Sequence, residues 1–153
     1  MNNTIPQSQI TAFRHAIDAL IRAFKVSEGV QHPDLSKPLS QTDVQALLYV
    51  VAHPLCIGAD LGQHLGMVPT TVSAIVDRLV RSGLLARSRT ETNRRIVQLQ
   101  PTAAGLRIAE QVIAGQEADC RLMLEALSDS ERQHFISMFG KIALAMARQE
   151  PEP

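Results

Sequence analysis

The sequence predicts a mainly α-helical fold with one small β-hairpin. Apolar residues recur three and four positions apart in several long segments, which is typical of helices that pack one face. One segment, residues 94–100, alternates apolar and polar side chains after the polar turn 90–93, as a strand does. The 153 residues, 45% hydrophobic and 20% charged, suit one ordinary globular domain spanning 1–153.

Residues 57–83 predict a short helix, a turn and a longer helix. Leu61 and Leu65 lie four positions apart on the first helix, and Gly66 suits its C-terminal end. Pro69 suits the first position of the second helix, where its missing N–H costs nothing. One face of the second helix is apolar and consists of Val72, Ile75, Val76, Leu79 and Val80. This is the arrangement that places a second helix in the DNA major groove, although a helix pair used only for packing is an alternative.

An arginine-rich hairpin follows the second helix. Gly83 ends that helix, and residues 84–100 predict two strands around a polar turn. Between Asp77 and Arg95 there are six arginines and two acids, which gives this stretch a net charge of +4 in a chain of zero net charge. Such a concentration indicates a surface for a polyanion. A solvated edge hairpin protected by its charge is the alternative.

Composition disfavours several other classes of function. Four phenylalanines, one tyrosine and no tryptophan argue against binding single strands or RNA through stacked bases. No stretch approaches the roughly 20 apolar residues of a membrane span, and the first residues lack the features of a signal peptide, so we expect a cytoplasmic protein. The histidines lack metal-ligand spacing, and no nucleophile, phosphate-loop or dinucleotide motif occurs. We therefore expect no enzyme activity, metal site or cofactor.

Capping signals mark the helices on either side of the middle segment. Ser40 is expected to begin a helix that stops before Pro54. Thr102 is expected to cap a long helix, and Ser128 with Glu131 forms a capping box that opens the last one.

The terminal helices are apolar over much of their length for so small a chain, so they need a partner surface. We expect residues 5–30 and 102–149 to form a two-fold homodimer, with residues 38–101 as the DNA-binding lobe. Two-fold symmetry would set two recognition helices on one face of DNA and predicts a pseudopalindromic operator.

The middle of the chain resembles the winged helix-turn-helix of the MarR family of transcriptional regulators. The elements that carry the resemblance are residues 59–62 (ADLG), 71–79 (TVSAIVDRL), 82–84 (SGL), 93–95 (NRR) and 99–105 (LQPTAAG). Asn93 stands where the family usually has an aspartate, which removes one partner of an Asp–Arg contact that would brace the wing. Gln100 stands where threonine is usual, and the wing arginine, Arg95, is retained.

The resemblance implies a homodimeric, sequence-specific regulator of double-stranded DNA that acts as a repressor. The residues expected to contact DNA are Thr70, Thr71, Ser73, Ala74, Arg78, Arg81, Arg87, Arg89, Arg94 and Arg95. Arg78 is the best candidate for paired hydrogen bonds to guanine. Arg94 and Arg95 would serve the wing, whereas Arg81, Arg87 and Arg89 would contact phosphate or brace the hairpin.

The resemblance also implies release from DNA by a small aromatic or phenolic effector. Arg14, His15, Phe24 and His53 are the candidate ligand residues, although His15 and His53 also suit ordinary surface or core positions. A protein-interaction module that does not read DNA is one alternative function. A redox-sensing regulator that uses a cysteine is another, although the family's peroxide sensors use a cysteine in the first helix, where this chain has none.

Overall fold

The computed structural model describes residues 4–23, 30–33, 35–89, 93 and 95–147. The chain divides into two compact units, residues 1–41 and 42–153, and each is described by itself. In the first unit, α1 (Gln7–Ala23) has no buried residue, and Val30 pairs with Leu39 as an isolated antiparallel bridge. The predicted single domain and its lobe boundaries stay predictions.

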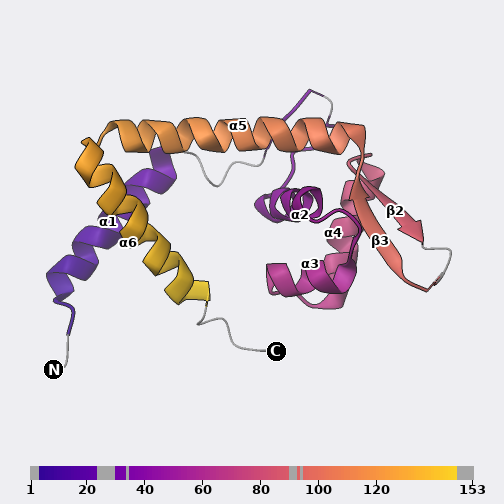
Figure 1. Cartoon of the computed structure of the whole chain (residues 1–153), viewed down its shortest axis with the longest axis horizontal. Helices are drawn as coiled ribbons and strands as arrows, with labels where there is room; N and C mark the ends of the chain where they lie inside the picture. Colours follow the sequence, from indigo (N-terminus) through magenta and orange to yellow (C-terminus); the bar gives the residue numbers. More distant parts are fainter. Residues whose placement is uncertain (1–3, 24–29, 34, 90–92, 94, 148–153) are drawn as a thin grey trace. The chain divides into compact units, whose positions relative to one another are not determined.

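The described helices of the rest of the chain fall where the caps and periodicity place them (Figure 1). They are α2 (Gln41–Ala52), α3 (Gly58–Leu65), α4 (Pro69–Arg81), α5 (Ala103–Glu125) and α6 (Asp129–Ala147). The Ser128 amide and hydroxyl donate to the Glu131 carboxylate at 2.8 and 2.6 Å, which confirms the capping role of Glu131 at the start of α6. None of the helices in the described part of the chain is both long and apolar enough to cross a membrane.

A three-stranded antiparallel sheet contains the predicted hairpin. The hairpin strands are β2 (Leu85–Arg89) and β3 (Val97–Pro101), and β1 (Cys56–Ile57) pairs with the other edge of β3. Leu99 at the centre of β3 lies opposite Arg87 of β2 and Cys56 of β1. The mainly α-helical fold with a hairpin wing is therefore confirmed. The sequence analysis missed β1, because two residues are too few to show an alternating pattern.

The core of the second unit joins α2, α3, α4, the sheet and the first half of α5. Its largest fully buried side chains are Leu47, Leu61, Ile75, Leu79, Leu84, Val44 and Val50. Four of the five residues predicted to form the apolar face of α4 are buried, and Val80 is half-buried. Each buried aliphatic side chain of this size contributes about 1.5–3 kcal/mol relative to exposure. The buried face of α4 therefore fixes which side of that helix reaches solvent.

The start of α5 is fastened to the turn that follows α4. The Thr102 hydroxyl donates to the Gly83 carbonyl at 2.6 Å and accepts from the Gly105 amide at 3.0 Å, as the predicted cap of α5. Gly83 itself adopts φ +71°, which glycine tolerates. A Cβ on Gly105 would lie 2.1 Å from the Leu84 carbonyl oxygen, so only glycine permits this approach. The turn and α5 thus share one tightly packed junction.

We predict that Gly105→Ala destabilises the fold by about 1–3 kcal/mol, because the new methyl group overlaps a backbone carbonyl that has to shift. Chemical denaturation followed by circular dichroism would measure the loss. Gly115→Ala is the matched control, since a Cβ at Gly115 of the same helix meets nothing within 4 Å. That control should be neutral or gain up to about 1 kcal/mol of helix propensity. Equal stabilities for the two variants would contradict the close packing at Gly105.

Candidate nucleic-acid interface

Helix α4 presents a polar, exposed face made mostly of short side chains. Its exposed members are Thr70, Thr71, Ser73, Ala74, Asp77, Arg78 and Arg81. Gly66 ends α3 with φ +62°, and a Cβ on Gly62 would lie 3.3 Å from Cγ2 of Val72 on α4, so the two helices approach closely through glycine. Pro69 occupies the first turn of α4, as predicted. The geometry leaves the N-terminal half of α4 open to a large flat or grooved partner.

Arg78, the predicted guanine-reading residue, is bonded to a carboxylate from another helix. Its Nε and Nη2 atoms donate to Oδ1 of Asp43 at 3.2 and 2.7 Å. Among the described residues Asp43 is the one buried charged residue. Asp43 was not among the residues predicted from the sequence to belong to the site. Its position four residues before Leu47, on the buried face of that helix, was the signal that it needed a partner inside the fold.

Asp77 joins α4 to the wing. Its carboxylate accepts a hydrogen bond from Nη2 of Arg87 on β2, and its backbone carbonyl accepts one from Nε of Arg81 at 3.2 Å. The Arg87 hydrogen bond holds the pKa of the Asp77 carboxyl below its ordinary range, partial desolvation opposes this, and the charges of Arg87 and Arg81 lower the pKa further. The pair therefore stabilises the fold above the ordinary aspartate pKa, and that contribution is lost as the pH falls through the lowered pKa.

Asn93 organises the turn at the wing. Its side-chain oxygen accepts the backbone N–H of Arg95 at 3.1 Å, and its backbone carbonyl accepts that of Ile96 at 3.1 Å. This is an Asx turn, which an amide forms as well as a carboxylate does. Arg89 and Arg95 are exposed on either side of the turn, and the predicted wing residue Arg94 lies outside the described residues. The neutral side chain at Asn93 is thus compatible with an ordered turn.

The predicted ligand residues are described separately because they fall in different units. In the first unit Arg14 pairs with Asp18 at 2.9 Å, and His15 is exposed on α1. Phe24 lies outside the described residues. In the second unit His53 is exposed and stacks on Tyr49, whose ring centroid lies 4.4 Å away. A ligand site formed by these residues stays a prediction.

His64 stacks on the same Tyr49 ring with a centroid distance of 4.4 Å, which places the tyrosine between two imidazoles. This stack joins α2 to α3, the first helix of the helix-turn-helix. Sequence reasoning missed it, because its members lie far apart in the chain and share no motif.

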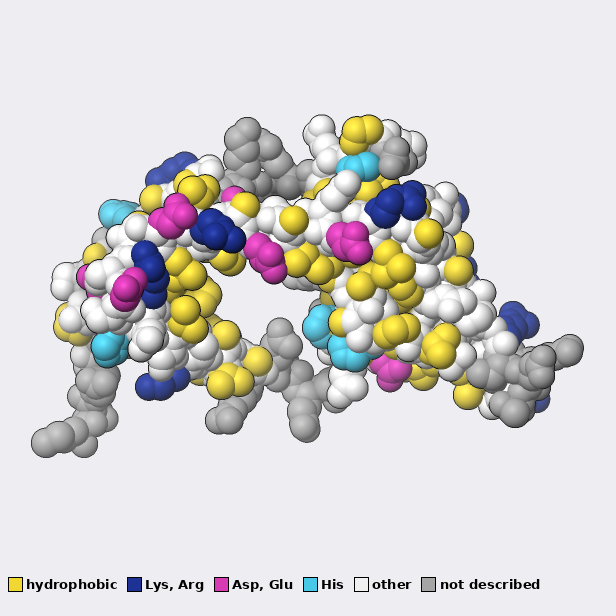
Figure 2. Space-filling view, turned by 45° about the horizontal axis from the view of Figure 1, so that its top comes forward, with side chains coloured by type: hydrophobic (Ala, Val, Ile, Leu, Met, Phe, Trp, Pro, Cys, Tyr) yellow, Lys and Arg dark blue, Asp and Glu magenta, His cyan; other side chains and the backbone are white. Residues whose placement is uncertain are grey.

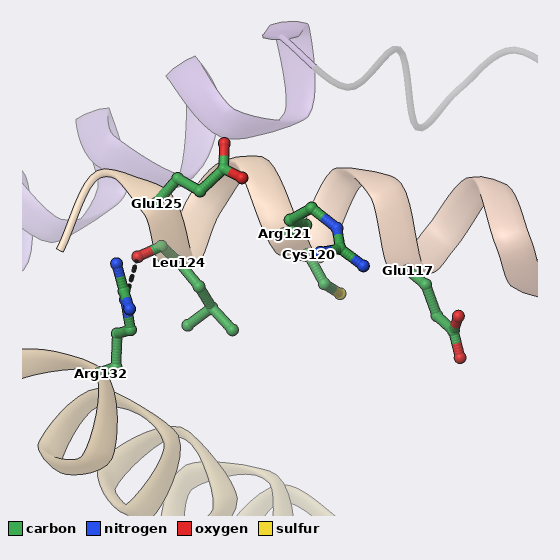
Figure 3. A pocket seen from close by; sticks show the side chains of 6 residues that line it. All are labelled: Glu117, Cys120, Arg121, Leu124, Glu125 and Arg132. Atoms are coloured by element: carbon green, nitrogen blue, oxygen red, sulfur yellow. Dashed lines mark hydrogen bonds between the residues drawn. The ribbon is translucent and has the colours of Figure 1, made fainter. Parts of the chain in front are cut away.

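A hollow of about 490 Å³ lies where α5 meets α6 (Figure 3). It is lined by Glu117, Cys120, Arg121, Leu124, Glu125 and Arg132. Arg132 donates to the Leu124 carbonyl at 2.8 Å, and this bond connects the two helices across the hollow. Of the predicted ligand residues, His53, which lies in the same unit, is not among the lining residues.

The two cysteines differ in environment. Cys56 of β1 is buried, and this burial, helped by the Asp60 carboxylate, raises the pKa of its thiol. A raised pKa lowers the thiolate fraction and with it the reactivity of Cys56. Cys120 is exposed on α5.

We predict that Arg87→Gln raises the pKa of Asp77 toward the ordinary aspartate value, because the variant removes the hydrogen bond that favours the carboxylate. A carboxyl-carbon NMR titration would measure the midpoint. Arg81→Gln is the control and should raise it less, since Arg81 acts on the carboxylate only through its charge. An unchanged midpoint in Arg87→Gln would mean that the pair does not form in solution.

Comparison with known proteins agrees with this geometry. The MarR family model matches residues 37–96, the segment that holds the helix-turn-helix and β2. The HTH-type transcriptional repressor MdtR of Bacillus subtilis is 26% identical over 125 residues, which cover 78% of this chain and 81% of MdtR.

Two solved structures share the fold. The structure of Streptococcus pneumoniae FabT in complex with DNA superposes with a TM-score of 0.72 at 20% identity, covering 94% of this chain and 96% of FabT. The PcaV transcriptional regulator of Streptomyces coelicolor, solved with its natural ligand, superposes with a TM-score of 0.60 at 22% identity over 94% of each chain. The family match over residues 37–96 and the shared fold therefore agree, and the chain resembles the MarR family of transcriptional regulators.

Proposed function

We propose that this protein is a cytoplasmic, homodimeric repressor that binds a specific sequence in double-stranded DNA through α4 and the wing. The observation that carries the proposal is the exposed face of α4, whose side chains from Thr70 to Ala74 are short, next to a hairpin that carries exposed arginines. Short side chains let the backbone of a helix approach base edges and phosphates closely, and the amides of a helix N-terminus suit phosphate oxygens.

Charge supports the same assignment. The stretch from Asp77 to Arg95 has a net charge of +4, and the rest of the chain sums to −4. Exposed Arg87, Arg89 and Arg95 extend the basic surface from α4 along the hairpin. A hairpin tip with arginine fits the minor groove, where the negative potential is greatest. The basic surface would thus face DNA.

The dimer is proposed from the apolar surface of α6, which has no buried residue in this chain. Its exposed large apolar residues are Ile136, Met138, Phe139, Ile142, Leu144 and Met146. Hydrophobic side chains reach the surface along this helix in Figure 2. Contiguous apolar surface of this kind marks an interaction site. A two-fold dimer would present two copies of α4 to half-sites roughly 34–36 Å apart in a pseudopalindromic operator.

Release by a small aromatic or phenolic effector is the regulatory part of the proposal. PcaV, which shares the fold, was solved with its natural ligand. Arg14, His15, Phe24 and His53 are the residues we would test first. The effector would favour a dimer whose half-site spacing no longer fits the operator. A winged helix that binds another protein is the competing function, and a strongly acidic α4 face would favour it, but Asp77 is the only acid on α4.

We predict that Arg95→Ala weakens operator binding at least tenfold, because it removes an exposed guanidinium at the wing tip without touching the core. Fluorescence anisotropy with DNA from upstream of the protein's own gene, read against a scrambled duplex at two salt concentrations, would measure the loss. Arg121→Ala on α5 is the control and should bind like the parent. Equal affinity of the parent for both duplexes at each salt concentration would favour the protein-interaction function.

We also predict that Phe139→Asp shifts the protein toward monomer, because a charge would replace an exposed ring in the proposed dimer surface. Light scattering during gel filtration would give the mass. Gln133→Asp places the same charge at an exposed polar position of α6 and should leave the dimer intact. A parent protein that elutes as a monomer would remove α6 from the dimer model.

A further inference from the structure

A buried carboxylate lies beneath the DNA-facing side of α4. The Asp43 side chain is 8% exposed, whereas the side chain of Arg78 bonded to it is 48% exposed. A buried carboxylate is tolerated when it is paired with a charge and hydrogen-bonded, and an arginine supplies both because it stays protonated. The pair therefore has one buried end, on α2, and one end at the surface of the recognition helix.

The geometry of the pair fixes the direction of the guanidinium. Both hydrogen bonds, from Nε and Nη2, go to the same oxygen, Oδ1 of Asp43. They use the side edge of the guanidinium fork, where the Nε–H and one Nη2–H point the same way. The end edge, formed by Nη1–H and the second Nη2–H, is turned away from these two bonds. The Arg78 side chain as a whole is 48% exposed.

The end edge of an arginine is one of the two edges that donate a pair of parallel hydrogen bonds. Guanine O6 and N7 in the major groove accept such a pair, and so do two oxygens of a phosphate. Only the first contact carries base identity. A guanidinium whose side edge is already bonded keeps fewer rotamers, so less conformational entropy is lost when the end edge binds.

We propose that Asp43, on a helix outside the helix-turn-helix, is a positioning residue for base recognition: it holds the side edge of Arg78 so that the end edge meets a guanine in the operator. This inference rests on the proposed function. Asp43 touches no DNA in this scheme and acts only through Arg78. The competing account is that the pair only stabilises the contact between α2 and α4. The two accounts differ in base preference, because loss of a purely stabilising pair weakens binding to all sequences alike.

The test is selection of preferred duplexes from a random pool by the full-length protein, followed by sequencing of the bound fraction. Parent, Arg78→Ala, Asp43→Ala and the double variant are compared, with Gln45→Ala, an exposed residue of the same helix, as the control. We expect the parent to enrich a site with a guanine at one position of each half-site. Arg78→Ala should lower the preference for that guanine about tenfold, within the range of one paired contact.

Asp43→Ala should lower the preference at the same position by a similar factor and leave the other positions unchanged. The double variant should lose no more than either single variant, because both act on one contact. Gln45→Ala should keep the parent preference. Asp43→Ala that retains the guanine preference, or that loses preference evenly over the whole site, would overturn the inference. A parent that enriches no sequence would overturn the proposed function as well, and this outcome is seen before any variant is compared.

A second substitution at the same position serves as the control for folding. Asp43→Asn keeps the shape and an acceptor oxygen but removes the charge, so it should remain folded and retain part of the guanine preference. Its thermal midpoint is measured beside the parent's. A folded Asp43→Asn with lower stability and an unreduced guanine preference would assign Asp43 a structural role only.

Discussion

The junction at Thr102 is the constraint on which the arrangement of α4, the wing and α5 depends. The Thr102 hydroxyl donates to the Gly83 carbonyl in the turn after α4, and it also caps α5. Gly105 lets α5 approach the Leu84 carbonyl. Because β2 starts at Leu85, the same few residues set the directions of α4, the wing and α5. In the proposed dimer, a contribution of α5 to the interface would set the spacing of the two α4 helices at this junction.

Much of this architecture could be predicted from residues whose effect is local. Gly66, Pro69, Gly83, Thr102 and Glu131 determine helix ends through backbone conformation or a neighbouring hydrogen bond, and each does so in the structure. The apolar face of α4 was readable because helical periodicity is itself local. The same holds for the hairpin, whose strands are adjacent in the sequence.

What could not be predicted depends on residues far apart in the chain. Asp43 and Arg78 are separated by 35 positions, and neither side chain signals the other in the sequence. The strand Cys56–Ile57 exists only because β3 offers it an edge. The stack of Tyr49 between His53 and His64 likewise forms from two helices that must first be packed. Of the candidate DNA-contacting residues, the sequence therefore predicted which face of α4 is exposed, but not which arginines are held by acids.

The pairing of arginines with acids changes the charge of this surface. Counting along the sequence assigns the stretch from Asp77 to Arg95 a charge of +4, but the carboxylate of Asp43 lies against Arg78 and lowers the local charge to +3. Arg87 is also paired, with Asp77. Paired arginines release fewer counterions on binding DNA, so they add less to sequence-independent affinity than exposed ones do. In the proposed function, the fixed orientation of Arg78 would instead favour a contact whose strength depends on the base. If the proposed function holds, the pairing would weaken the general attraction to phosphate and strengthen directed contacts, as discrimination of one operator among many sites requires.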